Sequence, residues 1–390
     1  FDVGAILGMY GLVPSESDTT LHTVYKDLSI AGGKLSTPNG NCTIGDITIA
    51  EFKARPLKTP FTALIAFAGE AEAQQDHPSP EMTAKAVGII TDIATAFETS
   101  PINFGGVDCA LTDDQGKPVT FTIGKIETAG YAGARFPEVR VSNFKVSASD
   151  GLVSLDGLTL KPIDYSGAIA SLQAANGVID DAWVEAHSRE LVPVFDGLSL
   201  TGLQIDVPDS SAPGQRIKAS VGSFDLSLAS YFNGVPTQIA SSAQHLVVDM
   251  PKDSSDDFTK QLVAMGLTRL DLSYDFSIKW DKDTNSIKLD KLGVSGANLG
   301  SIAVAAVLGN AGQELFDPNP DTAMAAGMGV TVKQVGLDVK DDGLGDILMK
   351  QAAADESTDP AAARAGISGM AQGMVMAFLG SNRDSLKLAN

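Results

Sequence analysis

A strict alternation of apolar and polar residues constrains the fold of this chain more than any other feature. Between Leu270 and Ile278, five apolar side chains alternate with four polar ones over nine residues. Because successive side chains of a β-strand point to opposite faces, this pattern predicts a strand with one dry face and one wet face. Such strands are typical of antiparallel sheets, whereas buried parallel strands are apolar along their whole length.

The same alternation recurs along most of the chain. It appears at residues 47–49, 119–123, 139–146, 200–207, 224–228, 287–292 and 330–339. Between Val141 and Phe144 the alternation shifts by one residue, which predicts a β-bulge. The segment from Asp281 to Ser286 separates two alternating runs and consists largely of turn-forming residues, so it predicts a hairpin.

Two segments carry the signals of amphipathic helices. Ser79 and Pro80 are typical of an N-cap and the first helical position. An apolar stripe behind them predicts that this helix packs one face on the sheet; it consists of Met82, Ala86, Ile89, Ile90, Ile93 and Phe97. Asp359-Pro360 opens the second helix, which ends at Gly380 and has the stripe Ile367, Met370, Met374 and Phe378. Weaker helical patterns cover residues 61–73, 165–175, 180–191, 256–265 and 344–354.

These elements predict a β-dominated α+β fold, in which an elongated, curved antiparallel sheet forms a groove flanked by amphipathic helices. The segment Thr43–Ala50 recurs as Thr122–Ala129, and Asp156–Leu160 recurs as Asp196–Leu200. These repeats favour a sheet built from strand–glycine–strand units. Residues 1–265 are predicted to form an extended β-rich domain with helical insertions near 61–99 and 165–191. Residues 266–390 continue the sheet and end in helices, and a single domain is the alternative.

Charge excludes two classes of partner. The chain has 28 basic and 48 acidic side chains, a formal charge of −20, and no basic block. Nucleic acids and anionic membrane surfaces both bind through clusters of Lys and Arg, so neither is expected as a partner. The longest apolar stretches, at residues 61–68 and 302–308, are far shorter than the roughly 18 residues that a membrane span needs. Residues 1–13 are predicted to form a packed helix, and the alternative is the tail of a trimmed signal or anchor.

The chain has two cysteines, Cys42 and Cys109, each within a β-like segment. A disulfide between them would indicate an oxidising compartment, and two buried free thiols are the alternative. The bond would close a loop of 67 residues. Neither cysteine belongs to a CxxC or Cys/His cluster, so a zinc site is not expected.

No motif for catalysis is present, neither HExxH, GxSxG, a phosphate-binding loop nor a dinucleotide fingerprint. His187, near Glu185 and Glu190, is the best single candidate for acid–base or metal chemistry, and a solvent-facing helix residue is the alternative. Adjacent carboxylates such as Asp180-Asp181 are predicted to cap helices and turns. We therefore predict no catalytic residue, no metal and no cofactor.

The turn that starts at Asp281 resembles the first part of a calcium-binding loop, with Asp283 and Asn285 at the next ligand positions. It departs from that loop further on, because Ser286 replaces the glycine of the sharp turn and Leu292 replaces the bidentate glutamate. The segment is therefore not an EF-hand.

One family resemblance can be given for about half of the chain. It is carried by the run Leu270–Leu308, which contains Trp280-Asp281, a turn and Ile287–Asp290, and by the two glycine-containing repeats. This arrangement resembles the AsmA-like and YdgA-like exported envelope proteins of Gram-negative bacteria. The resemblance implies a long curved sheet with an apolar inner face, a role in lipid handling or envelope maintenance, and no catalytic residues.

Apolar side chains therefore carry the functional hypothesis. Six of the ten methionines lie in the C-terminal region, and methionines line adaptable apolar surfaces as well as cores. We predict a periplasmic or otherwise exported, non-enzymatic protein that binds a hydrophobic small molecule or lipid on the sheet, between flanking helices. The predicted lining residues are Leu272, Tyr274, Phe276, Ile278, Met370, Met374 and Phe378. The opposite face of the strand is the alternative lining, because a sequence does not fix strand register. The alternative function is a structural or self-assembling envelope component that contacts other envelope proteins.

Overall fold

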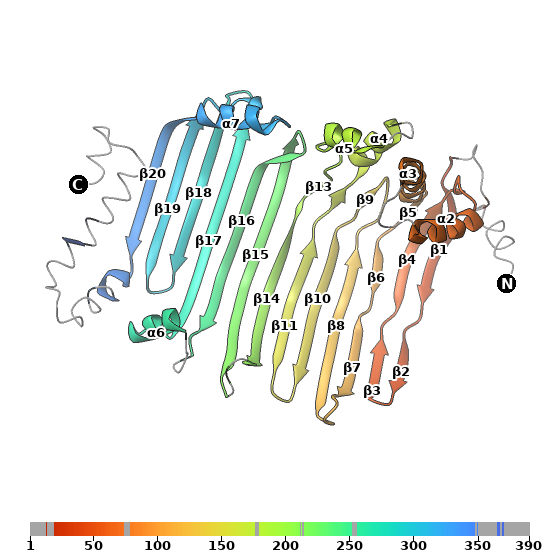
Figure 1. Ribbon diagram of the computed structural model, residues 1–390. Coiled ribbons are helices and arrows are strands. Elements are labelled where there is room, and N and C mark those ends of the chain that lie inside the picture. The colour runs from red at the N-terminus through yellow and green to blue at the C-terminus, as the bar shows by residue number, and fades with distance from the viewer. Residues whose placement is uncertain are drawn as a thin grey trace. The chain divides into compact units, whose positions relative to one another are not determined.

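The computed structural model describes residues 19–73, 79–175, 179–210, 214–251 and 256–347, together with residues 13, 212, 349, 365, 366 and 369. Among these residues, seventeen strands belong to one antiparallel sheet that does not close, and three short strands form a second sheet (Figure 1). Several helices accompany the sheet. The predicted β-dominated fold with a long antiparallel sheet and additional helices is confirmed.

The chain forms two compact units. The first consists of Phe1–Leu203, Asp225–Gln238 and Phe316–Pro320, and the second of Gln204–Phe224, Ile239–Leu315 and Asp321–Asn390. Three strands contribute residues to both units: β14 (Gly197–Pro208), β15 (Arg216–Phe232) and β16 (Val235–Asp249).

The first unit contains most of the short strands. Their bounds are β1 (His22–Ile30), β2 (Gly33–Thr37), β3 (Gly40–Ile44), β4 (Ile47–Ala54), β5 (Phe97–Thr99), β6 (Ile102–Phe104), β7 (Val107–Thr112), β8 (Pro118–Thr128), β9 (Arg135–Phe136), β10 (Val139–Ala148), β11 (Leu152–Leu160), β12 (Ile163–Asp164) and β13 (Val194–Phe195). Strand β1 pairs with β4, β4 with β5 and β6, and β3 with both β2 and β7. Strands β6 and β7 both pair with β8. Strand β8 pairs in turn with β10, and β10 pairs with β11.

The second unit contains a simple antiparallel run of strands. These are β17 (Arg269–Asp281), β18 (Ser286–Gly296), β19 (Gly300–Gly309) and β20 (Thr331–Asp341), and each pairs with the next. The hairpin predicted between β17 and β18 is confirmed, because Asp281 Oδ1 accepts hydrogen bonds from the backbone N–H groups of Asp283 (2.9 Å) and Thr284 (3.3 Å).

Glycines mark positions where neighbouring segments of the first unit approach too closely for a side chain. A Cβ atom at Gly45 would lie 2.3 Å from the backbone of Gly105, and one at Gly124 would lie 2.8 Å from the Cβ of Asn143. Gly45 and Gly124 are the glycines of the two Thr-Ile-Gly-x-Ile repeats, so each repeat places a glycine at such a contact. Asn143 has a φ of 55° and is skipped in the pairing of β10 with β8 and β11, but the register is the same on both sides of it. The bulge predicted between Val141 and Phe144 is therefore not found, because no extra residue is inserted on β10.

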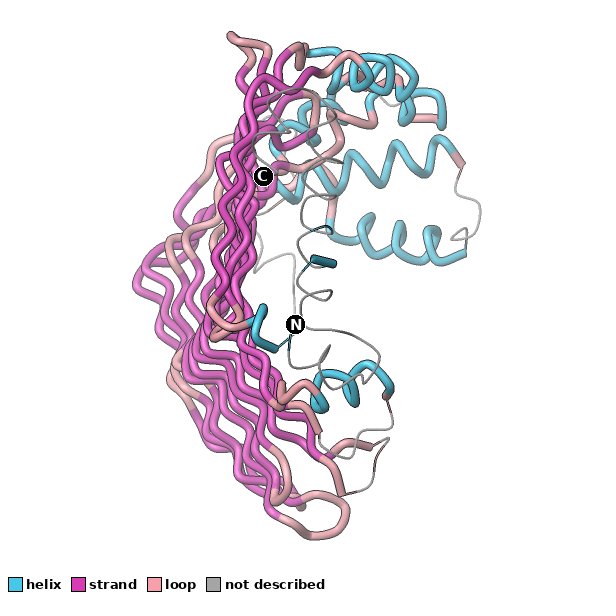
Figure 2. Tube along the Cα trace, turned by 90° about the vertical axis from the view of Figure 1, so that its left-hand side faces the viewer, coloured by secondary structure: helices cyan, strands magenta, loops and turns pink. Residues whose placement is uncertain are grey.

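Six α-helices and one 3₁₀-helix have bounds within the described residues. They are α2 (Phe61–Ala73), α3 (Pro80–Thr95), α4 (Ser166–Ala174), α5 (Asp181–His187), α6 (Asp257–Ala264), α7 (Pro320–Met328) and the 3₁₀-helix η1 (Gln313–Phe316). In the first unit, the helices project from one side of the strands (Figure 2). Helix α7 was not predicted, although Pro320 at its first position is a helix-start signal. The predicted helices at residues 1–13 and after Asp359-Pro360 lie outside the described residues except for residues 13, 365, 366 and 369, of which the last three are helical.

Helix α3 begins as predicted, since the Ser79 side chain accepts a hydrogen bond from the Met82 N–H at 3.1 Å. The predicted packing of its apolar stripe is correct only in part, because Met82, Ala86 and Ile89 are half-buried. The buried residues of the helix are Thr91 and Asp92, whereas Ile90 is 62% exposed. The cause is a buried ion pair: Asp92 lies 2.7 Å from the guanidinium of Arg55, which follows β4. Phe97, the last residue of the predicted stripe, belongs to β5.

Candidate functional site

One face of the β17–β20 sheet is apolar over four rows of paired residues. Directly paired residues of neighbouring strands lie on the same face, and the register therefore defines which side chains share it. One row across the strands is Tyr274, Val294, Ile302 and Val339, and the next is Phe276, Leu292, Val304 and Leu337. Two further apolar rows are Ile278, Leu289, Ala306 and Val335, then Trp280, Ile287, Leu308 and Val332. The fifth row, at the other end of the face, consists of Leu272, Gly296, Gly300 and Asp341 and so ends in a carboxylate.

The opposite face of the same strands is polar. Its rows include Ser273, Ser295, Ser301 and Lys340, then Asp275, Gly293, Ala303 and Asp338. Lys291 Nζ also reaches Asp275 Oδ2 at 2.9 Å on this side. The two faces therefore differ sharply in polarity, which is what the alternation in the sequence predicts.

Side chains of the apolar face are open to solvent in the part of the chain that the structure describes. The exposed fractions are 44% for Leu292, 47% for Val294, 47% for Ile302 and 65% for Val339. No large side chain of the described residues is fully buried. Exposed apolar surface of this kind in a folded protein is typical of a binding or assembly surface.

The apolar face has one firmly packed end. Trp280 is 7% exposed, and its indole N–H donates a hydrogen bond to the Ala311 carbonyl at 2.7 Å. Ala306, in the neighbouring row, is 9% exposed. The indole therefore fixes one end of the face, while the rows of Phe276 and Tyr274 lie further from this anchor.

The structure brings four of the predicted lining residues onto this face. Leu272, Tyr274, Phe276 and Ile278 alternate along β17, and all four are half-buried. The Tyr274 hydroxyl forms a 3.0 Å hydrogen bond with Ser241 Oγ of β16. The other three predicted lining residues, Met370, Met374 and Phe378, lie outside the described residues.

Sequence reasoning missed most of the apolar face. The side chains on β19 and β20, among them Ile302, Val304, Leu337 and Val339, were not predicted as lining residues. The alternation at residues 330–339 is a signal for β20. The pairing of β20 with β19 across a 21-residue connection is not visible in the sequence, because the connection contains η1 and α7.

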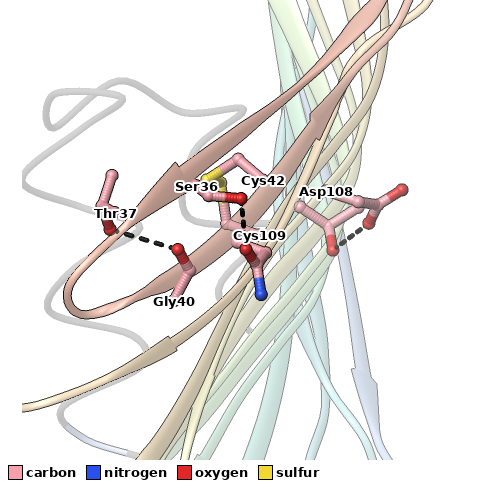
Figure 3. The surroundings of a disulfide bond; sticks show 8 residues. Ser36, Thr37, Gly40, Cys42, Asp108 and Cys109 are labelled. Atoms are coloured by element: carbon pink, nitrogen blue, oxygen red, sulfur yellow. Dashed lines mark hydrogen bonds between the residues drawn. A yellow bond between two sulfur atoms is a disulfide. The ribbon is translucent and has the colours of Figure 1, made fainter.

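Cys42 and Cys109 form a disulfide bond, which decides between the two alternatives left by the sequence. The cysteines are directly paired on β3 and β7, with their Cα atoms 4.0 Å apart (Figure 3). Nearby hydrogen bonds link Ser36 to Asn41 and Thr122 to Asp108. A disulfide is compatible with an oxidising compartment such as that of an exported protein.

His187 does not lie in a cluster with carboxylates. Its ring stacks on Trp183 with the ring centres 4.3 Å apart, and its Nδ1 lies 2.9 Å from the Trp183 carbonyl oxygen. Glu190, one of the predicted partners, instead accepts a 2.6 Å hydrogen bond from Ser171. Within the described residues, no group of three or more His, Cys, Asp or Glu side chains could hold a metal ion.

Adjacent carboxylates serve as caps, as the sequence predicts. Asp180 accepts a hydrogen bond from the Trp183 N–H at 2.8 Å, and Asp256 accepts one from the Thr259 N–H at 2.7 Å. Asp341 accepts hydrogen bonds from the N–H groups of Gly343 and Gly345, which lower the pKa of its carboxyl group. Asp281 in the β17–β18 turn likewise has a lowered pKa, mainly because of hydrogen bonds from Thr284. These carboxylates are stabilised in their charged form by turn geometry.

Comparison with known proteins gives one partial match. A family model described as "Uncharacterized protein" matches residues 293–388, about a quarter of the chain, and begins within β18. No curated protein and no solved structure matches the chain. In the part of the chain that the structure describes, no helix has the length and apolarity needed to cross a bilayer.

Proposed function

We propose that the protein binds the hydrocarbon part of a lipid or a similar hydrophobic molecule on the apolar face of β17–β20. The observation that carries this proposal is that four rows of the face are apolar while several of their side chains are exposed. The row Tyr274, Val294, Ile302 and Val339, for example, holds no polar group except the Tyr274 hydroxyl. The function is one of binding or transfer without catalysis.

Burial of the ligand supplies the affinity. Each methylene group that leaves water contributes about 0.8 kcal/mol. The face extends over about nine residues of β17, which corresponds to a length of about 30 Å at about 3.3 Å per residue. An acyl chain lying along the strands therefore contacts apolar side chains over its whole length. The protein side chains are also covered, which removes their own exposed apolar surface.

An exported location, such as the periplasm, fits this function. The Cys42–Cys109 disulfide requires an oxidising environment to persist, and the acidic surface gives no basic patch for docking on anionic membranes. We propose that the protein supports maintenance of the cell envelope as a carrier of hydrophobic molecules. The resemblance to AsmA-like and YdgA-like proteins supports the same proposal.

A charge placed on the apolar face tests the proposal. Val294→Asp introduces a carboxylate at a side chain that is 47% exposed, so folding is expected to survive. Binding of a fluorescently labelled phosphatidylethanolamine should weaken at least tenfold, because an ionised group would have to be desolvated beside the acyl chain. The matched control is Ser295→Asp, which places the same charge on the next residue and the opposite face.

The control variant separates an effect of the apolar face from a general effect of added charge. We expect Ser295→Asp to bind the labelled lipid as the unmodified protein does. Equal binding by the Val294→Asp and Ser295→Asp proteins, both folded by circular dichroism, would contradict the proposed site.

A second candidate function is self-assembly, and the edge of β20 favours it. Among the described residues, β20 pairs with β19 alone, which leaves one row of its backbone groups without a strand partner. Exposed strand edges can pair with another chain. A sedimentation coefficient that rises with protein concentration, together with a lipid-free purified protein, would favour this candidate over lipid binding.

A further inference from the structure

Helix α3 leaves two of its isoleucines outside the core of the first unit. The buried Arg55–Asp92 ion pair turns Thr91 and Asp92 inward. Ile90 and Ile93 are consequently 62% and 40% exposed. A helix that exposes isoleucines next to a cleft presents apolar surface to whatever occupies that cleft.

Such a cleft lies between α3 and α4. Its volume is about 490 Å³, within the range of small-molecule sites. Its walls are mostly apolar and include Val87, Ile90, Ala94, Phe136, Ile169 and Leu191. These residues come from two helices, the short strand β9 and the segment after α5. We name this space the apolar cleft.

Aromatic packing holds the floor of the apolar cleft. The Tyr131 hydroxyl donates a 2.6 Å hydrogen bond to the Ala94 carbonyl of α3. Its ring stacks on Phe97 at 4.6 Å between ring centres and meets Phe136 edge-on at 6.2 Å. Burial raises the pKa of Tyr131, consistent with a hydroxyl that stays neutral. The Tyr131 side chain, which lines the apolar cleft, is therefore held in place by contacts within the protein and does not depend on a ligand.

A more polar cleft of about 570 Å³ adjoins the apolar one. The two share Val87, Thr91 and Leu172 as lining residues, which places them side by side at the contact of α3 with α4. Lys58 lines the polar cleft. Asp92 also lines it, but its charge is balanced by Arg55 at 2.7 Å.

Lys58 gives this polar cleft a net positive charge. Its side chain is exposed, and within the described residues its ammonium group forms no ion pair. Its backbone N–H donates a 2.9 Å hydrogen bond to Asp92 Oδ2, which holds the residue at the rim of the cleft. An anionic group in this cleft would meet an available cation.

We propose that the two clefts together form a binding site for a single-chain anionic amphiphile, with its chain in the apolar cleft and its head group near Lys58. This site goes beyond the proposed function, because it lies in the first unit and uses none of the residues of the apolar face. The chemical class is a fatty acid or a lysolipid with an anionic head group.

Titration with dodecanoate tests the tail part of this site. Ile90→Asp should weaken dodecanoate binding at least tenfold, since it places a carboxylate at the mouth of the apolar cleft. The matched control is Ile65→Asp on α2, because Ile65 is 61% exposed and lines neither cleft. Equal affinity of the two variants would overturn the proposal.

The head-group part is tested with Lys58→Gln and an uncharged ligand. Loss of the ammonium group should weaken dodecanoate several-fold and leave dodecanol binding unchanged. An equal effect on both ligands, or no effect on either, would contradict the role of Lys58.

The titrations are repeated with Val294→Asp to separate the two sites. If Ile90→Asp weakens dodecanoate binding both in the unmodified protein and in the Val294→Asp protein, the cleft proposal is supported. This result would support the cleft even if the apolar face turned out not to bind lipid. A loss that follows Val294→Asp alone would place dodecanoate on the apolar face and overturn the cleft proposal.

Discussion

Asn143 shows how single residues shape this sheet. It lies within β10 in the left-handed region of backbone conformation, at a φ of 55°. Asparagine adopts this conformation more readily than most residues do. The neighbouring strand carries Gly124 at the contact point, where a Cβ would lie 2.8 Å from the Cβ of Asn143. This local irregularity thus depends on two residues on adjacent strands: Asn143 adopts the left-handed conformation, and Gly124 leaves room for it.

Substitution of Gly124 by alanine tests this account. Gly124→Ala should lower the free energy of unfolding by about 1–3 kcal/mol, because the new methyl group is forced against Asn143 on β10. Gly33→Ala is the matched control, since Gly33 also lies in a strand and a Cβ there would meet nothing within 4 Å. Urea denaturation measures both changes. Similar denaturation midpoints for the two variants would show that the close approach is not important.

At the scale of elements, the sequence predicts which segments form but not always which way they face. Ser79 and Pro80 predict the start of α3 correctly. The helical stripe does not predict the buried face, because the Arg55–Asp92 ion pair joins residues that are 37 positions apart and overrides the apolar stripe. In β17–β20 the alternation predicts the apolar residues of each strand. The complete face depends on strand pairing, which brings β20 beside β19.

The disulfide between β3 and β7 gives a prediction at this scale. It closes a loop of 67 residues, so its removal should lower the free energy of unfolding by about 4 kcal/mol in the chain-entropy treatment. Urea denaturation of the Cys42→Ser/Cys109→Ser protein, compared with the oxidised unmodified protein, measures this difference. A reducing agent should destabilise the unmodified protein and leave the double variant unaffected. A stability that is the same with and without the bond would contradict a structural role.

At the scale of the whole molecule, the sequence predicts the class of fold and leaves the ligand open. Alternation over many segments predicts a sheet with one apolar side, and the acidic composition predicts that partners which need basic surfaces do not bind. The two clefts beside α3 were not predicted, because they depend on side chains from several distant segments. A ligand that is bound by apolar contact leaves no motif in the sequence, since ordinary core residues have the same composition.

The proposed function of the protein is to carry a hydrophobic molecule on the apolar face of β17–β20. The most direct measurement is native mass spectrometry of the purified protein, followed by solvent extraction and identification of the released compound. The account predicts a bound species of lipid mass that is retained by the unmodified and Ser295→Asp proteins and lost from the Val294→Asp protein. A mass equal to that of the bare chain in all three proteins, especially together with higher oligomers, would contradict lipid binding and favour the self-assembling component.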